Sequence, residues 1–181
     1  MSNPTADVSV RVAWADDAPA IAELQLRTWQ EQYADLLPPD ALPRDIGAAA
    51  AAWQASLSRP PDARNRVLVA LERNRVVGFA ITAPASDPDC DPSADGELME
   101  LTVAPDERGK GHGSRLLQAA VDTLQADKFS RAVLWAIADD DALRAFLSEA
   151  GWAPDTAHRG LDFDGTGSTI VKQVRLHTSL A

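Results

Sequence analysis

A glycine-rich run between residues 108 and 114 carries the clearest chemical signal in the sequence. It consists of Arg108, Gly109, Lys110, Gly111, His112, Gly113 and Ser114. An apolar segment typical of a buried strand precedes it at 98–103, and residues 114–124 repeat apolar side chains at helical spacing. The glycines therefore lie at the beginning of a predicted helix, where unpaired N–H groups and the helix dipole favour an anion. Glycine also lets the backbone approach that anion closely, so the run predicts a di- or triphosphate site.

The spacing of the glycines excludes two familiar nucleotide motifs. The sequence G-x-x-x-x-G-K-[ST] does not occur, and glycines 109, 111 and 113 do not have the spacing of the dinucleotide motif G-x-G-x-x-G. The pattern that remains is R-x-x-G-x-G, after a strand that ends in Val103-Ala104-Pro105. Arg108 and Lys110 add cationic donors to this run, although the whole chain carries a formal net charge of -10.

This pattern resembles the signature of the GNAT superfamily of acyl-coenzyme A dependent N-acetyltransferases, in which [QR]-x-x-G-x-[GA] follows a strand ending in V-x-P. Residues 10–29, 132–137 and 139–152 also resemble segments of that family, so the resemblance covers most of the chain. It implies an enzyme that uses acetyl-coenzyme A as cosubstrate and needs no metal. The acceptor would be a primary amine of a small molecule or peptide, which attacks the thioester directly in a ternary complex.

The resemblance also implies roles for individual residues. Leu101, Thr102 and Val103 would offer backbone groups to pantetheine, with the Val103 N–H donating to the oxyanion, and the 108–114 run would hold the pyrophosphate. Two positions depart from the family: Asp140 stands where Asn is common, and Leu147 where a Tyr often protonates the leaving thiolate. Asp140 can still accept a hydrogen bond from a pantetheine amide, and it also suits a helix N-cap. Leucine cannot donate a proton, so another acid, water or direct departure of the thiolate must serve.

Acetylation of an amine also needs a base, and Glu97 and Glu100 lie beside the expected thioester position. In a regular strand they point to opposite faces, so only one would enter the cleft unless a bulge intervenes; we prefer Glu97. A solvated carboxylate at a strand end is the alternative for each. Trp29 and Tyr33 are four residues apart on one helical face, which suits either an aromatic wall over the acceptor or a place in the core.

The order of the predicted elements, a hairpin first and β-α-β later, predicts an α/β fold with a mixed sheet and helices on both faces. The family resemblance implies the same architecture, with a mostly antiparallel sheet of about seven strands. We expect strands at 8–13, 67–71, 76–82, 98–103, 132–137, 160–164 and 169–176, and helices at 17–33, 45–57, 114–124 and from about 140. The family resemblance adds that the fourth and fifth strands splay apart and leave a cleft for pantetheine.

Length and composition predict one domain over residues 1–181, with flexible tails at 1–7 and 178–181. At 181 residues and 45% hydrophobic content, the chain has the usual size of a domain with a single core. The uncharged stretch 46–57 is too short to span a bilayer, and no signal-peptide pattern opens the sequence, so we expect a cytoplasmic protein. The net negative charge argues against nucleic acids and anionic membranes as partners.

Other features leave alternatives open. Four aspartates in the loop 84–96 superficially resemble a calcium loop, but Pro92 stands where that loop needs glycine, so we expect no metal site. A homodimer is common in the family and is expected here on that ground. Because Leu147 replaces the usual Tyr, an acyl-coenzyme A binding module with little turnover is a second hypothesis. A structural α/β domain, whose glycines serve only the turn, is the third.

Overall fold

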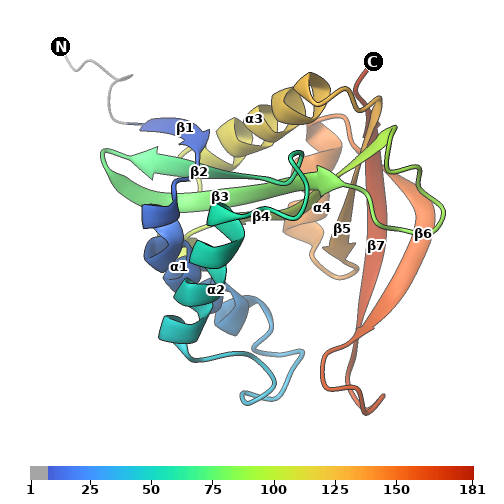
Figure 1. The fold of residues 1–181 in the computed structure, drawn as a ribbon. Helices are drawn as coiled ribbons and strands as arrows, with labels where there is room; N and C mark the ends of the chain where they lie inside the picture. Colours follow the sequence, from blue (N-terminus) through green and yellow to red (C-terminus); the bar gives the residue numbers. More distant parts are fainter. Residues whose placement is uncertain (1–7) are drawn as a thin grey trace.

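The computed structural model describes residues 8–181, which build one seven-stranded sheet (Figure 1). From edge to edge the strands are β1 (Val8–Val12), β2 (Arg66–Glu72), β3 (Arg75–Pro84), β4 (Asp95–Val103), β5 (Arg131–Ile137), β7 (Ile170–Ser179) and β6 (Ala153–Asp162). Neighbouring strands are antiparallel except β4 and β5, which run parallel. The mixed α/β fold that the sequence predicts is therefore confirmed.

Helices cover both faces of this sheet (Figure 1). They are α1 (Ala18–Gln32), α2 (Ile46–Ser58), α3 (His112–Ala126) and α4 (Asp141–Glu149). On one face, Leu116 and Leu124 of α3 are fully buried against Leu98 of β4, because the apolar positions of α3 recur at helical spacing. On the other face, Ile21 of α1 packs against Phe79 of β3. In residues 8–181, no helix combines the length and the apolar surface that a bilayer crossing demands.

The strands β4 and β5 lie side by side only at their beginnings. Their parallel pairing joins residues 95–97 of β4 to residues 131–133 of β5. Beyond that point β4 continues along β3, whereas β5 continues along β7. The facing edges of the two strands therefore diverge, as the resemblance implies, and their backbone groups on that side are left for another partner.

Several boundaries differ from the prediction by two or more residues, among them the start of β4, which is Asp95 rather than residue 98. Helix α3 begins at His112 rather than at residue 114, and β6 begins seven residues before the predicted start at 160. Along β6 the side chains alternate between half-buried and exposed, because it is an edge strand, so the apolar pattern that reveals a strand is weak. At the other end, β7 runs to Ser179 and Leu180 is buried, where the sequence predicts a flexible tail over 178–181. The predicted tail at 1–7 lies outside the described residues.

Candidate active site

The run at 108–114 forms a tight loop that leads into the first turn of α3. Gly109 and Gly111 have φ angles of 77° and 84°, in the left-handed region that disfavours any side chain. Gly111 is the N-cap of α3, and its carbonyl accepts from the N–H of Arg115 at 3.1 Å. The N–H groups of residues 112–114 therefore point out of the helix end, where they can bind an anion.

The two predicted cations of this loop have different surroundings. Arg108 is exposed, and within residues 8–181 no ion pair engages its guanidinium. The Lys110 ammonium instead donates to the Glu107 carboxylate at 2.7 Å, and Arg75 binds the same carboxylate. Lys110 first, and then Arg75, lower the pKa of Glu107 to about 2. Arg108 is therefore the cation that remains available to a bound anion, while Lys110 supports the loop.

Two further side chains shape the loop in ways that the sequence did not reveal. The ring of His112 is only 2% exposed and lies 3.3 Å from the Glu72 carboxylate, so this residue offers its backbone rather than its ring to a ligand. Arg115 donates to the Lys110 carbonyl at 3.3 Å, and its guanidinium lies 3.4 Å from where a Cβ on Gly111 would be. The only signal in the sequence for a role of Arg115 in this loop is its position four residues after Gly111, on the same face of the helix.

A cleft of about 820 Å³ connects the loop to the open edge of β4 and to α4. The predicted coenzyme residues that line it are Leu101, Thr102, Val103, Arg108, Gly109, Gly111, His112, Gly113, Ser114 and Asp140. Lys110 alone among the predicted coenzyme residues turns elsewhere, toward Glu107. The structure therefore brings one phosphate-binding loop and one open strand edge into a single cleft.

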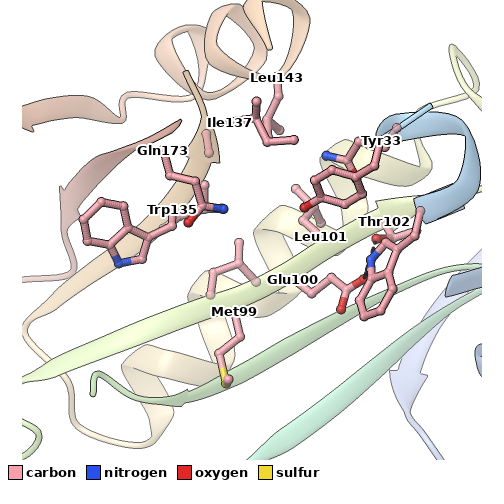
Figure 2. Close-up of a pocket in the computed structure, with 14 residues that line it drawn as sticks. Tyr33, Met99, Glu100, Leu101, Thr102, Trp135, Ile137, Leu143 and Gln173 are labelled. Carbon is pink, nitrogen blue, oxygen red and sulfur yellow. Dashed lines mark hydrogen bonds between the residues drawn. The ribbon is translucent and has the colours of Figure 1, made fainter. Parts of the chain in front are cut away.

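A second cavity, of about 160 Å³, lies where β4 and β5 diverge (Figure 2). Its aromatic wall comes from Trp29 and Tyr33 at the end of α1 and from Trp135 on β5. Among the 14 residues that line it, Glu100 is the only charged one. The residues that line both the cavity and the larger cleft are Gln32, Leu101, Thr102, Ile137 and Leu143. The two spaces therefore share a wall.

Glu100 is held in this cavity by three hydrogen-bond donors. Its carboxylate accepts from the Gln25 amide at 2.8 Å, from the Trp29 indole at 3.1 Å and from the Thr102 hydroxyl at 3.3 Å. Burial raises the pKa of Glu100, and the three donors oppose that rise. A carboxylate with a raised pKa is suited to take a proton from an ammonium ion and release it again. Trp29, for which the sequence left open an aromatic wall or a place in the core, thus also donates a hydrogen bond to this carboxylate.

A bulge at Met99 brings Glu97 and Glu100 to the same face of β4. In the ladder with β3, Ala83 lies opposite Glu97 and Ile81 lies opposite Glu100, so three steps on β4 match two on β3. Residues 81 and 83 share a face, and their partners must share one too. The expectation of opposite faces, which holds for a regular strand, therefore does not apply here.

Glu97 nevertheless has different neighbours from Glu100. It is 7% exposed and lies where β4 and β5 are still paired. Burial raises the pKa of Glu97, with a smaller contribution from the charge of Asp87, while Arg159 and Arg175 oppose the rise. The structure brings Glu100, and not Glu97, onto the cavity wall.

The two positions that depart from the family have clear structural roles. Asp140 caps α4, because its carboxylate accepts from the Leu143 N–H at 3.0 Å, as an N-cap is predicted to do. Leu147 is fully buried in the core beneath α3. Tyr33, the only tyrosine of the chain, lines the cavity and contacts Phe163 edge-on at 5.3 Å between ring centroids. Burial, followed by the charge of Glu100, raises the pKa of Tyr33, so its phenol stays protonated.

Comparisons with known proteins give a family and a shared fold. Residues 18–152 match the model of the acetyltransferase (GNAT) family. The structure of yncA from Salmonella typhimurium, which holds its cofactor acetyl-CoA, is 20% identical with a TM-score of 0.72, covering 97% of this chain and 95% of that one. The ribosomal-protein-alanine N-acetyltransferase of Brucella melitensis is 19% identical with a TM-score of 0.73, covering 94% of this chain and 99% of that one.

A third similar structure, the paiA N-acetyltransferase of Thermoplasma acidophilum in complex with coenzyme A, is 15% identical with a TM-score of 0.70. The match covers 99% of both chains. Among curated proteins, none matches the sequence. At these identities the likeness to solved structures shows a shared fold, which extends over nearly the whole length of each chain.

Proposed function

Because the chain belongs to the acetyltransferase (GNAT) family, it is an acyltransferase that uses acetyl-coenzyme A, and we propose that its acceptor is a primary amine of a small molecule or peptide. One observation carries this proposal: the cavity that contains Glu100 shares five wall residues with the cleft at the glycine loop. An amine bound in the cavity and a thioester bound in the cleft would therefore be neighbours, with Leu101 and Thr102 lining both sites. The reaction we propose is direct attack in a ternary complex.

The coenzyme end of the cleft binds through main chain. The N–H groups of residues 112–114 and the guanidinium of Arg108 hold the diphosphate. The free edge of β4 at Leu101 pairs with the pantetheine amides, and the Val103 N–H donates to the developing oxyanion. The backbone groups of Thr102 face β3 instead, because Ala104, two residues along, donates to Val77 of β3. Each of these groups lines the same cleft, which supports their assignment to one extended ligand.

The proton transfers belong to two side chains of the smaller cavity. Glu100 accepts a proton from the acceptor ammonium, so that the free amine can attack, and it releases this proton to water before the next turnover. A bond forms between this nitrogen and the acetyl carbon while the bond from that carbon to sulfur breaks. Tyr33 gives its hydroxyl proton to the leaving sulfur, in place of the tyrosine that Leu147 replaces, and the proton that the nitrogen then loses restores the phenol.

A covalent acetyl-enzyme is disfavoured by the position of the only cysteine. Cys90 lies in the loop between β3 and β4, where its sulfur accepts from the Arg175 guanidinium at 3.4 Å. Burial raises the pKa of its thiol, which lowers the fraction of reactive thiolate. Direct transfer needs no such nucleophile, and this supports the ternary complex.

The experiment that tests the proposal measures release of free coenzyme A. Purified protein is incubated with acetyl-coenzyme A and a panel of primary amines, and the free thiol is titrated. We expect release that depends on the amine. Tight binding of acetyl-coenzyme A without amine-dependent release would instead favour the second candidate, an acyl-coenzyme A binding module, which is motivated by Leu147 at the position of the usual acid.

A cytoplasmic location and a homodimeric state complete the proposal. The single cysteine excludes an internal disulfide and is compatible with a reducing compartment. Light scattering on the eluting protein checks the dimer, and cell fractionation checks the location.

A further inference from the structure

We propose that Trp53, on α2, is a positioning residue that acts through Gln25 to keep Glu100 in the role of a hydrogen-bond acceptor. This inference rests on the proposed function, in which Glu100 takes the proton of the acceptor amine. Trp53 is not among the residues that line the cavity, and its ring packs edge-on against Phe79 at 5.6 Å between centroids. Its effect on the reaction must therefore pass through another side chain.

A chain of hydrogen bonds provides that path. The Trp53 indole N–H donates to the Gln25 side-chain oxygen at 2.9 Å, and the Gln25 amide nitrogen donates to Glu100 at 2.8 Å. An indole N–H can only donate, so the atom of Gln25 that faces it must be the oxygen. The NH₂ group is then directed to the carboxylate. Trp53 thus orients the Gln25 amide so that its NH₂ group, and not its oxygen, faces Glu100.

The orientation of this amide matters because its two ends act on Glu100 in opposite ways. An NH₂ donor stabilises the ionised carboxylate, whereas a carbonyl oxygen would favour the protonated acid, which can donate to it. Gln25 is 9% exposed, so it has little access to water that could replace a lost partner. Without the indole N–H, its oxygen would be unsatisfied, and rotation of the amide would relieve that cost at the expense of the carboxylate.

Few other titratable groups face Glu100. Within residues 8–181, Tyr33 at the end of α1 is the one whose pKa responds to the charge of Glu100. Glu97 shares the face of β4 but lies where β4 and β5 are paired. From β5 and β7 the facing side chains are Trp135 and Gln173, and neither carries a charge. Burial has the largest effect on the pKa of Glu100, and the hydrogen bonds from Gln25 and Trp29 of α1 are the main contacts that oppose it.

The test measures the protonation of Glu100 without relying on turnover. Protein labelled with ¹³C at the glutamate side-chain carboxyl is titrated by NMR, and the Glu100 signal is identified by its loss in Glu100→Gln. Trp53→Phe keeps an aromatic ring against Phe79 but removes the N–H. We expect the pKa of Glu100 to rise by about one unit in this variant. Trp14→Phe makes the same change at an exposed tryptophan and should leave the pKa of Glu100 as it is.

A double-mutant cycle separates the effect of this chain of hydrogen bonds, called the relay below, from a general effect of packing on the pKa of Glu100. In a Gln25→Leu background, Trp53→Phe should produce no further shift, because the intermediate amide is gone. An unchanged pKa of Glu100 in Trp53→Phe, or a rise that persists in Gln25→Leu, would overturn the inference. The kinetic profile reports separately on the base: if the acid limb of kcat/KM moves with the NMR pKa, Glu100 is the base. If the NMR pKa moves and the profile does not, the relay stands and the proposed base is wrong.

Discussion

The two ends of the reaction cleft are built in different ways. The diphosphate end comes from one continuous stretch, 108–114, and relies on main-chain N–H groups set by two left-handed glycines. The acceptor end takes its walls from α1, β4, β5, β7 and α4, and its chemistry relies on the side chains of Glu100 and Tyr33. The first end therefore depends on local backbone conformation and the second on packing between distant segments. Substitutions should separate coenzyme binding from turnover.

The largest effect is expected where the main-chain site is broken. Gly111→Val places a β-branched side chain at a φ of 84° and against the Arg115 guanidinium. Affinity for acetyl-coenzyme A should fall roughly 10²- to 10⁴-fold, because two or more charge-assisted hydrogen bonds of about 1.5–3 kcal/mol each are lost. Isothermal titration calorimetry measures this loss.

Gly151 provides the matched control for this substitution. Its φ is 93°, with open space around its Cβ position, and it follows α4 rather than the loop. Gly151→Val should destabilise the fold by about 1–2 kcal/mol through backbone strain, as Gly111→Val does, but it should leave the affinity for acetyl-coenzyme A unchanged. Equal losses of affinity in the two variants would show that the loop has no special role.

The next effect tests the acceptor end. Tyr33→Phe removes the hydroxyl and keeps the ring beside Phe163. We expect kcat to fall roughly 100-fold, at the low end for loss of a general acid because water can substitute, with no change in affinity for acetyl-coenzyme A. Steady-state kinetics with saturating coenzyme measures kcat. An unchanged kcat would restrict Tyr33 to lining the cavity.

The smallest effect distinguishes the two cations of the loop. Arg108→Ala removes the cation that no ion pair in residues 8–181 engages, and affinity for acetyl-coenzyme A should fall about tenfold. Lys110→Ala removes a cation already bound to Glu107, so the loss should stay below about threefold. Calorimetry at two salt concentrations compares them, and the reverse order would contradict the assignment.

The sequence predicts the coenzyme end of the site better than the acceptor end. The glycine loop could be predicted because its residues are adjacent and its function is a property of backbone geometry. The bulge at Met99 has no signal in the sequence, and it decides how Glu97 and Glu100 are oriented. Gln25 and Trp53 could not be predicted either, because they reach Glu100 only after α1 and α2 pack together. Strand β6 was predicted too short because an edge strand lacks a strong apolar pattern.

The central claim is that Glu100, in the cavity that adjoins the coenzyme cleft, accepts the proton of the amine. It is tested most directly by the pH dependence of kcat in Glu100→Gln beside the matched variant Glu97→Gln. Burial raises the pKa of Glu100, so wild-type kcat should fall as the pH drops through that raised value and the carboxylate becomes protonated. Glu100→Gln should lower kcat about 10²- to 10⁴-fold and abolish this acid limb, with coenzyme affinity intact, whereas Glu97→Gln should stay within about threefold of wild type. Wild-type turnover in Glu100→Gln, with loss of turnover in Glu97→Gln, would contradict the claim.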